Sequence, residues 1–222
     1  MSAFFVTGTG TDIGKTFVTS GLIRHLRRQD RPVSALKPVV SGFALENAAV
    51  SDPGMLLAAL DEPLTDANIA RLSPWQYAAA LSPDMAAARE GNSVPYDDIL
   101  AVCRRAIAET QGTLLIEGVG GAMVPLDARH TVLDWMADLD LPTILVAGSY
   151  LGTISHTLTA LAAMADRGLV PAVLAINDTG DSPVSLTETA DTIARFAPTL
   201  PIVTIPRDAK DVDFATLAAK LL

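Results

Sequence analysis

A glycine-rich loop near the amino terminus constrains the fold of this chain more than any other feature. Residues 8–16 read Gly-Thr-Gly-Thr-Asp-Ile-Gly-Lys-Thr and lie between an apolar run and an amphipathic stretch. A strand followed by such a loop and then by a helix is the context that a phosphate-binding loop requires. Glycine lets the loop turn its backbone N–H groups inward, where they bind phosphate oxygens. The sequence therefore predicts a site for a nucleoside triphosphate with Mg²⁺.

Two side chains at the end of this loop have the chemistry that such a ligand needs. We expect Lys15 to reach the β- and γ-phosphates and the Thr16 hydroxyl to coordinate Mg²⁺. The spacing is irregular, because five residues separate Gly8 from Gly14 where the general pattern has four, and Thr9 stands in the place of the first glycine. The alternative is a glycine-rich turn with an incidental Lys-Thr pair, which the flanking strand and helix disfavour.

Short apolar runs alternate with longer amphipathic stretches along the rest of the chain. Several runs are apolar throughout, as in strands that are covered on both faces of a parallel sheet. The predicted strands are residues 3–7, 33–36, 113–116, 143–147, 172–176 and 201–204. The predicted helices are residues 16–28, a helix that starts after an N-cap at Ser93, and residues 153–166, 187–195 and 214–221. Residues 43–93 are expected to mix short helices with loops on the substrate side.

This alternation predicts the fold class. With 222 residues the chain is long enough for one sizeable core, so we expect a single α/β domain over residues 1–222. Right-handed crossovers between the strands would give a P-loop NTPase-like three-layer α/β/α sandwich with a mostly parallel central sheet. Ligands in such sheets gather at the carboxyl ends of the strands.

Charged residues follow two of the predicted strands at that end. Glu117 ends the run at residues 113–116 and could bind Mg²⁺ directly or through water, or could face solvent in a glycine turn. Lys37 follows residues 33–36 and would converge with Lys15 on one phosphate, although a surface lysine beside a turn fits the pattern equally well. Asp52, in Ser-Asp-Pro, fits either a metal ligand or the opening of a helix.

Composition argues against several other classes. The formal net charge is −9, and the only basic group is a short cluster of arginines, Arg24, Arg27 and Arg28, better interpreted as the solvated face of a helix. We therefore expect no nucleic-acid partner. The single cysteine, Cys103, rules out an internal disulfide and fits a cytoplasmic protein. No apolar run of 18 residues or a signal-peptide pattern occurs, so we expect no membrane partner.

Motifs in order from residue 6 to residue 178 resemble those of one known family, dethiobiotin synthetase. Its own phosphate-binding loop is similar to the irregular spacing seen here. The motifs are Val6-Thr7-Gly8-Thr9-x-Thr11-x-x-Gly14-Lys15-Thr16, Lys37-Pro38-Val39-x-Ser41-Gly42, Ser51-Asp52, Glu117-Gly118-x-Gly120-Gly121, Asp134-Trp135, Leu151-Gly152 with His156, and Asn177-Asp178.

The resemblance implies an enzyme of biotin biosynthesis that is homodimeric and depends on ATP and Mg²⁺. Its substrates would be 7,8-diaminononanoate, CO₂ and ATP. One amine would add CO₂ to form a carbamate, whose oxygen attacks the γ-phosphate and gives a carbamic-phosphoric anhydride. The second amine would then displace phosphate and close the cyclic urea of dethiobiotin.

The resemblance also implies roles for individual residues. Lys37 and Lys15 would be catalytic, and Thr16, Asp52 and Glu117 would form the metal shell. Asn177 would read the adenine edge beside Pro206. The remaining nucleotide contacts would be Thr11, Asp12, Ile13, Gly14, Phe17, Gly118, Val119, Gly120 and Asp178. The diamine would contact Ser41 and, from the partner subunit, Leu151, Gly152, Thr153 and Ser155. Asp12, Tyr150 and Ser155 depart from residues common in the family, and the last two bear on the carboxylate end of the substrate.

Two other classes of protein share features with this sequence. A nucleotide-dependent switch of the partitioning or division-site type has a similar fold but carries a signature lysine five residues before the loop lysine, where this chain has Gly10. An amidotransferase-type synthetase would need a glutaminase domain with a cysteine nucleophile and a histidine partner. The only cysteine, Cys103, lies in the middle of a predicted helix and does not suit the role of this nucleophile.

Overall fold

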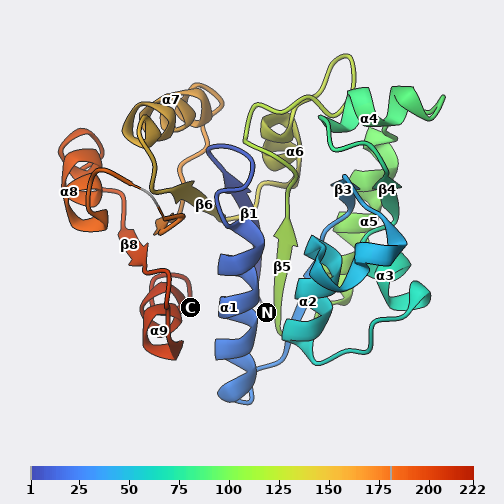
Figure 1. Cartoon of the computed structure of the whole chain (residues 1–222), viewed down its shortest axis with the longest axis horizontal. Coiled ribbons are helices and arrows are strands. Elements are labelled where there is room, and N and C mark those ends of the chain that lie inside the picture. Colours follow the sequence, from blue (N-terminus) through green and yellow to red (C-terminus); the bar gives the residue numbers. More distant parts are fainter. Residues whose placement is uncertain (1, 181) are drawn as a thin grey trace.

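A six-stranded parallel sheet forms the centre of the computed structural model, which describes residues 2–180 and 182–222 (Figure 1). The strand order is β2-β5-β1-β6-β7-β8, and every neighbouring pair is parallel. The strands are β1 (Ser2–Gly8), β2 (Val33–Leu36), β5 (Thr113–Glu117), β6 (Thr143–Gly148), β7 (Val173–Asn177) and β8 (Ile202–Ile205). All six lie where the apolar runs predict strands, which confirms the mostly parallel α/β sheet.

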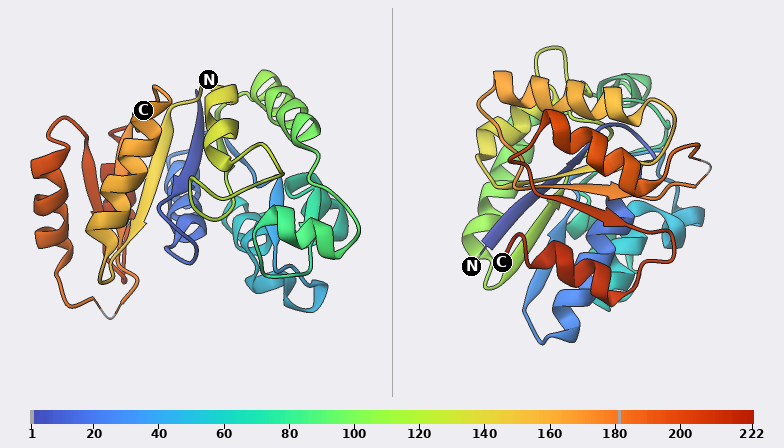
Figure 2. Two further views of the ribbon diagram at one scale, coloured as in Figure 1. Left: turned by 90° about the horizontal axis from the view of Figure 1, so that it is seen from above. Right: turned by 90° about the vertical axis from the view of Figure 1, so that its left-hand side faces the viewer.

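Helices cover both faces of this sheet, as the turned views show (Figure 2). One layer contains α1 (Lys15–Arg28), α2 (Asp52–Leu60) and α9 (Asp211–Ala218). The other contains α5 (Tyr96–Glu109), α6 (Val132–Leu139), α7 (Thr153–Asp166) and α8 (Leu186–Phe196). Successive strand residues point to opposite layers, so Phe4 and Val6 of β1 pack toward α1 whereas Phe5 packs edge-on against Trp135 of α6. The predicted three-layer sandwich is therefore confirmed.

The chain between β2 and β5 is the part for which the sequence predicts the fewest definite helices and strands. It contains a second, two-stranded parallel sheet, β3 (Val39–Ser41) with β4 (Trp75–Tyr77). It also contains a 3₁₀ helix (Leu45–Val50), α3 (Asp66–Leu72) and α4 (Pro83–Arg89). Short helices were expected over residues 43–93, but the small sheet was not.

Two predicted helix starts are wrong. The helix predicted after Ser93 begins at Tyr96 with Pro95 as its N-cap, because a residue that precedes proline is driven away from the α conformation and Val94 cannot join the helix. The last helix spans Asp211–Ala218 and not residues 214–221. The Asp213 carboxylate accepts the backbone N–H of Lys210 at 2.7 Å, which starts that helix three residues earlier.

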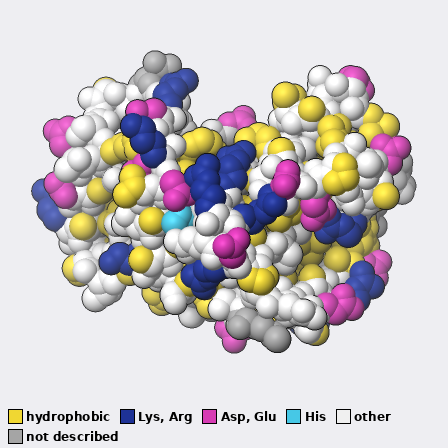
Figure 3. Space-filling view, turned by 90° about the horizontal axis from the view of Figure 1, so that it is seen from below, with side chains coloured by type: hydrophobic (Ala, Val, Ile, Leu, Met, Phe, Trp, Pro, Cys, Tyr) yellow, Lys and Arg dark blue, Asp and Glu magenta, His cyan; other side chains and the backbone are white. Residues whose placement is uncertain are grey.

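The basic side chains at the carboxyl end of α1 behave as the sequence predicts. Figure 3 looks onto this face and shows lysine and arginine side chains interspersed with acidic ones. Arg27 pairs with Asp61 at 3.2 Å and Arg28 pairs with Asp211 at 2.8 Å. These pairs are consistent with a solvated helix face. None of the helices in the described part of the chain has the length and apolar character that crossing a bilayer takes.

Candidate active site

The glycine-rich loop joins β1 to α1, and Gly14 is the N-cap of that helix. Gly14 has a φ of 92°, in the left-handed region. A Cβ atom at this position would lie 2.1 Å from the Nδ2 of Asn177, so the loop and the end of β7 approach closely only because residue 14 is glycine. The helix start leaves its first N–H groups without helical partners, which suits a phosphate.

Lys15 lies inside this loop with only 8% of its surface exposed. Its Nζ donates to the carbonyl oxygen of Gly10 at 2.9 Å. Burial and, after it, the positive charge of Lys37 lower the pKa of Lys15 to about 8, and the acids Glu117, Asp52 and Asp12 offset only part of that effect. A lysine held in this way would gain a strong favourable interaction from an anionic ligand.

Thr16 and two acids meet directly behind the loop. The Thr16 hydroxyl oxygen lies 2.7 Å from Oδ1 of Asp52 and 2.7 Å from Oε1 of Glu117. Asp52 is the first residue of α2, whose N-cap Ser51 accepts the N–H of Gly54, so the Ser-Asp-Pro sequence opens a helix as one of its two interpretations predicts. Glu117 ends β5 and is fully buried.

Lys37 completes this cluster from the end of β2. Its Nζ lies 2.9 Å from Oε1 of Glu117 and 3.1 Å from Oδ2 of Asp52, and it donates to the carbonyl oxygen of Gly118 at 3.0 Å. The side chain is 2% exposed. Burial disfavours the charged form and by itself would lower the pKa of Lys37. The carboxylates of Glu117 and Asp52 outweigh that effect and raise the pKa. Lys37 is therefore a charged, buried lysine and not the surface lysine of the alternative interpretation.

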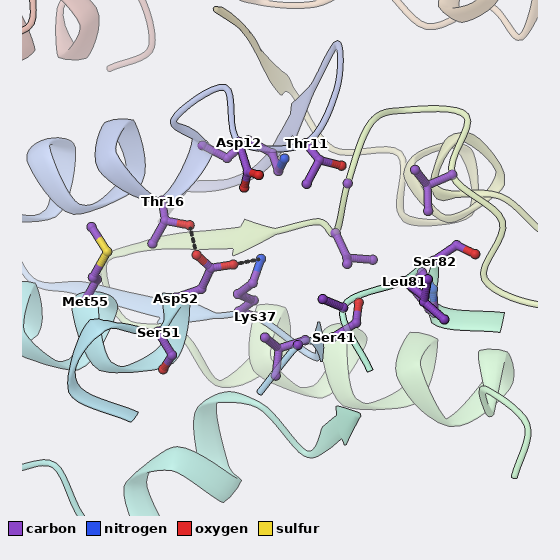
Figure 4. A pocket seen from close by; sticks show the side chains of 18 of the residues that line it. Thr11, Asp12, Thr16, Lys37, Ser41, Ser51, Asp52, Met55, Leu81 and Ser82 are labelled. Atoms are coloured by element: carbon purple, nitrogen blue, oxygen red, sulfur yellow. Dashed lines mark hydrogen bonds and ion pairs between the residues drawn. The ribbon is translucent and has the colours of Figure 1, made fainter. Parts of the chain in front are cut away.

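Lys15, Thr16, Lys37 and Asp52 line a cleft of about 860 Å³ (Figure 4). In Figure 4 the side chains of Thr11, Asp12 and Thr16 lie on one side and those of Ser41, Leu81 and Ser82 lie on another, with Lys37 and Asp52 between them. Many of the other residues that line the cleft are apolar or small. The cleft is also lined by Val40, Gly42, Val50, Ala80, Pro83 and Val124.

A second pocket, of about 270 Å³, adjoins the loop near the ends of β7 and β8. Asp12, Gly14 and Phe17 line both hollows. The other residues that line the small pocket are Asn177, Asp178, Thr179 and Arg207. The two hollows together can hold an elongated ligand that crosses the loop.

The structure brings most of the predicted site residues to these two hollows. The cleft is lined by the predicted residues Thr11, Asp12, Gly14, Lys15, Thr16, Phe17, Lys37, Ser41, Asp52, Val119 and Gly120. Glu117 and Gly118 lie just behind it and contact Lys37, and the carbonyl of Ile13 accepts from Asn177. Pro206 precedes Arg207 but lines neither hollow.

Residues predicted to bind substrate at the start of α7 lie elsewhere. Leu151, Gly152, Thr153 and Ser155 line neither the cleft nor the small pocket of their own chain. Leu151 is 82% exposed, whereas Thr153 is buried and donates to the carbonyl of Gly148. The wall residues Ala80, Leu81 and Val124 and the pocket residue Arg207 were not predicted, because no motif marks them.

This geometry defines the class of protein. A parallel sheet whose central strand leads through a glycine-rich loop into a helix, with a buried lysine and a threonine at the helix start, is the arrangement of P-loop nucleotide-binding proteins. A family model described as an AAA domain matches residues 2–212. The cell division ATPase MinD of Pyrococcus furiosus is 16% identical, has a TM-score of 0.57, and aligns over 99% of this chain and 98% of its own. A MinC:MinD cell division protein complex of Aquifex aeolicus is 13% identical and has a TM-score of 0.58, and the alignment covers 98% of this chain and 86% of that one. These likenesses show the fold alone.

Sequence comparison identifies the family within that class. An ATP-dependent dethiobiotin synthetase BioD of Acidiphilium cryptum is 49% identical over 196 residues, which is 88% of each chain. That of a Caulobacter species is 45% identical over 223 residues, covering 100% of this chain and 95% of its own. The chain belongs to the ATP-dependent dethiobiotin synthetase family, as its motifs predict.

Proposed function

We propose that this protein catalyses the ATP-dependent ring-closing carboxylation of 7,8-diaminononanoate with CO₂, giving dethiobiotin, ADP and phosphate in biotin biosynthesis. The observation that carries the proposal is the cluster of Lys15, Thr16, Lys37, Asp52 and Glu117 beneath a cleft large enough for a second substrate. The relatives named ATP-dependent dethiobiotin synthetase over nearly the whole chain support it.

Magnesium fits the residues of this cluster. A threonine hydroxyl and two carboxylates are hard oxygen donors of the kind that Mg²⁺ prefers, and it usually keeps waters as further ligands. Oε2 of Glu117 is buried and has no hydrogen-bond partner in the described structure, so one ligand atom is available. No group of three His, Cys, Asp or Glu side chains that could hold a metal occurs within residues 2–180 and 182–222. Thr16, Asp52 and Glu117 would hold the ion, which would neutralise charge on the phosphates.

The two lysines would act on the transferred phosphoryl group. The loop amides and Lys15 would hold the triphosphate, and Lys37 would contact the carbamate oxygen and the γ-phosphate, both of which are anionic. Attack of the carbamate oxygen on phosphorus releases ADP. Attack of the second amine on the carbamate carbon then releases phosphate and closes the ring. Fixed positive charge at the place where negative charge develops lowers the barrier without reorganisation.

The diamine would occupy the part of the cleft that Ser41 lines. We propose a homodimer in which Leu151, Gly152, Thr153 and Ser155 of one subunit bind the substrate carboxylate of the other through the N–H groups at the start of α7. Their position outside the cleft of their own chain and the exposure of Leu151 support this arrangement. We also propose a single domain that works in the cytoplasm without nucleic-acid or membrane partners.

A product assay tests this function. The purified protein is incubated with ATP, Mg²⁺, bicarbonate and 7,8-diaminononanoate, and dethiobiotin is sought by mass spectrometry while phosphate release is followed. We expect one phosphate for each cyclic urea formed. A nucleotide switch of the division-site type would release phosphate slowly and without response to the diamine, and that result would refute the proposal.

A further inference from the structure

The carbonyl oxygen of Gly118 is one of three acceptors that hold the Lys37 ammonium group. Lys37 donates to it at 3.0 Å, and the other two acceptors are the carboxylates of Glu117 and Asp52. An ammonium group has three N–H donors, so these acceptors occupy all of them. Both carboxylates are also proposed ligands of Mg²⁺, whereas the carbonyl is neutral and belongs to the backbone. The place of the Gly118 carbonyl therefore helps to determine where the charge of Lys37 lies.

Contacts from β1 and α6 hold the backbone of Gly118. Its N–H donates to the carbonyl oxygen of Val6 at 2.9 Å. The ring of Phe5 covers its Cα, because a Cβ atom at position 118 would lie only 3.0 Å from Cε1 and 3.2 Å from Cζ of that ring. Such a Cβ would also lie 3.4 Å from Cγ1 of Val132, the first residue of α6. A glycine backbone is conformationally free, so these contacts are what limit its movement here.

Trp135 of α6 holds the Phe5 ring in turn. The two ring centroids are 4.9 Å apart and the ring planes meet at 84°, an edge-to-face pair. Both side chains are fully buried. Val132 and Trp135 are three residues apart on α6 and therefore share one face of that helix. Because a close-packed interior transmits small displacements, a shift of the Phe5 ring would reach the backbone of Gly118.

We propose that Phe5 is a positioning residue for phosphoryl transfer, because its ring holds the Gly118 backbone whose carbonyl oxygen orients Lys37. Trp135 supports the ring in this position. The inference rests on the proposed function, in which Lys37 acts on the γ-phosphate. It adds to that function an apolar residue that is buried outside the cleft and determines how well Lys37 is oriented.

Steady-state kinetics of three variants test the inference. Phe5→Leu removes the ring but keeps an apolar side chain in the core, and Trp135→Phe weakens only the support of that ring. Phe4→Leu is the matched control, because Phe4 is the preceding residue of β1, is 4% exposed and packs toward α1 on the opposite face of the sheet. Both leucine variants lose one buried ring, so both should lower Tm to a similar extent.

The expected result is a loss in kcat that only the Phe5 side of the strand produces. We expect Phe5→Leu to lower kcat about tenfold, because a misplacement of about 1 Å can cost on the order of a hundredfold. KM for ATP should stay within about twofold, because Lys15 and the loop hold the triphosphate. Trp135→Phe should show a smaller loss of the same kind, and Phe4→Leu should keep the wild-type kcat. Turnover is expressed for each ATP site counted by calorimetry, so unfolded protein does not lower kcat.

A double-mutant cycle tests the contact itself. Gly118→Ala places a Cβ against the Phe5 ring in the wild type, whereas Phe5→Leu takes that ring away. We therefore expect Gly118→Ala to lower kcat by a smaller factor in the Phe5→Leu protein than in the wild type. Equal factors in the two backgrounds would show that the ring does not constrain Gly118.

Other outcomes would also overturn the inference. Wild-type kcat in Phe5→Leu would do so, and so would an equal loss in Phe4→Leu, since damage to the core around β1 would then explain both. If Phe5→Leu does not fold, wild-type kcat in a folded Trp135→Phe overturns it. A wild-type protein without diamine-dependent turnover would refute the proposed function, and this inference with it, whereas an active wild type beside an unimpaired Phe5→Leu would refute the inference alone.

Discussion

Replacement of Lys15 by methionine should stabilise the free protein while it removes triphosphate binding. The pKa of Lys15 falls from 10.5 to about 8, so its charge at neutral pH costs roughly 3 kcal/mol, at 1.36 kcal/mol for each pKa unit. Methionine keeps the buried stem of the side chain and carries no charge. It also gives up the bond to the Gly10 carbonyl, which contributes about 1 kcal/mol. We therefore expect the free energy of unfolding to rise by about 1–2 kcal/mol at pH 7.

Urea denaturation without nucleotide at several pH values measures this effect. The folded pKa of Lys15 lies below its unfolded value, so the unfolded chain holds the proton more tightly between pH 8 and pH 10.5, and the wild type gains stability as pH rises through that window. The advantage of Lys15→Met should be complete below pH 8 and should vanish by about pH 10.5.

The same substitution at Lys37 is the matched control and should have the opposite sign. Lys37→Met leaves the fully buried Glu117 carboxylate without its partner at 2.9 Å, and breaking a buried pair costs about 3–5 kcal/mol. A Lys15→Met protein that is less stable than the wild type at pH 7, or whose difference from the wild type does not change with pH, would refute the reasoning.

Three further predictions concern the ligands. Glu117→Gln keeps the shape of that side chain but weakens a proposed metal ligand, so the Mg²⁺ concentration for half-maximal turnover should rise about tenfold or more; an unchanged requirement would remove Glu117 from the metal shell. Gly14→Ala places a Cβ against Asn177 and a non-glycine residue in the left-handed region. We expect the free energy of unfolding to fall by about 1–3 kcal/mol and ATP to bind more weakly, which thermal melting and calorimetry would measure. ITP presents an oxygen where ATP has an amino group, so the buried Oδ1 of Asn177 should make ITP bind about tenfold more weakly or worse; equal affinities would contradict a contact between Asn177 and the adenine edge.

The sequence predicts the central sheet well and the chain between β2 and β5 poorly, for physical reasons. The four inner strands, β1, β5, β6 and β7, are mostly buried on both faces and appear as apolar runs. The strands β3 and β4 have three residues each, too short for an alternating pattern to emerge. Helix α6 was not predicted, although Thr131 and Asp134 form a capping box that could have marked its start.

In the candidate site, too, local sequence patterns predict some residues and miss others. Lys15 and Thr16 belong to a local motif, so their places follow from sequence spacing alone. The pairing of Lys37 with Glu117 depends on β2 lying beside β5, and strand order is a property of the whole sheet that no local pattern contains. Arg207 belongs to no motif and contacts the pocket only because β8 lies beside β7.

The position of the small sheet has a consequence for how one side of the cleft can be altered. Strands β2 and β5 are neighbours, so everything between them is a single excursion from one edge of the central sheet. That excursion carries residues 80–83, which line the cleft, and its Asp52 contacts Thr16 at the end of the phosphate loop. Substitutions at residues 80–83 that leave Asp52 unchanged would therefore reshape this side of the cleft without disturbing the contact between Asp52 and Thr16.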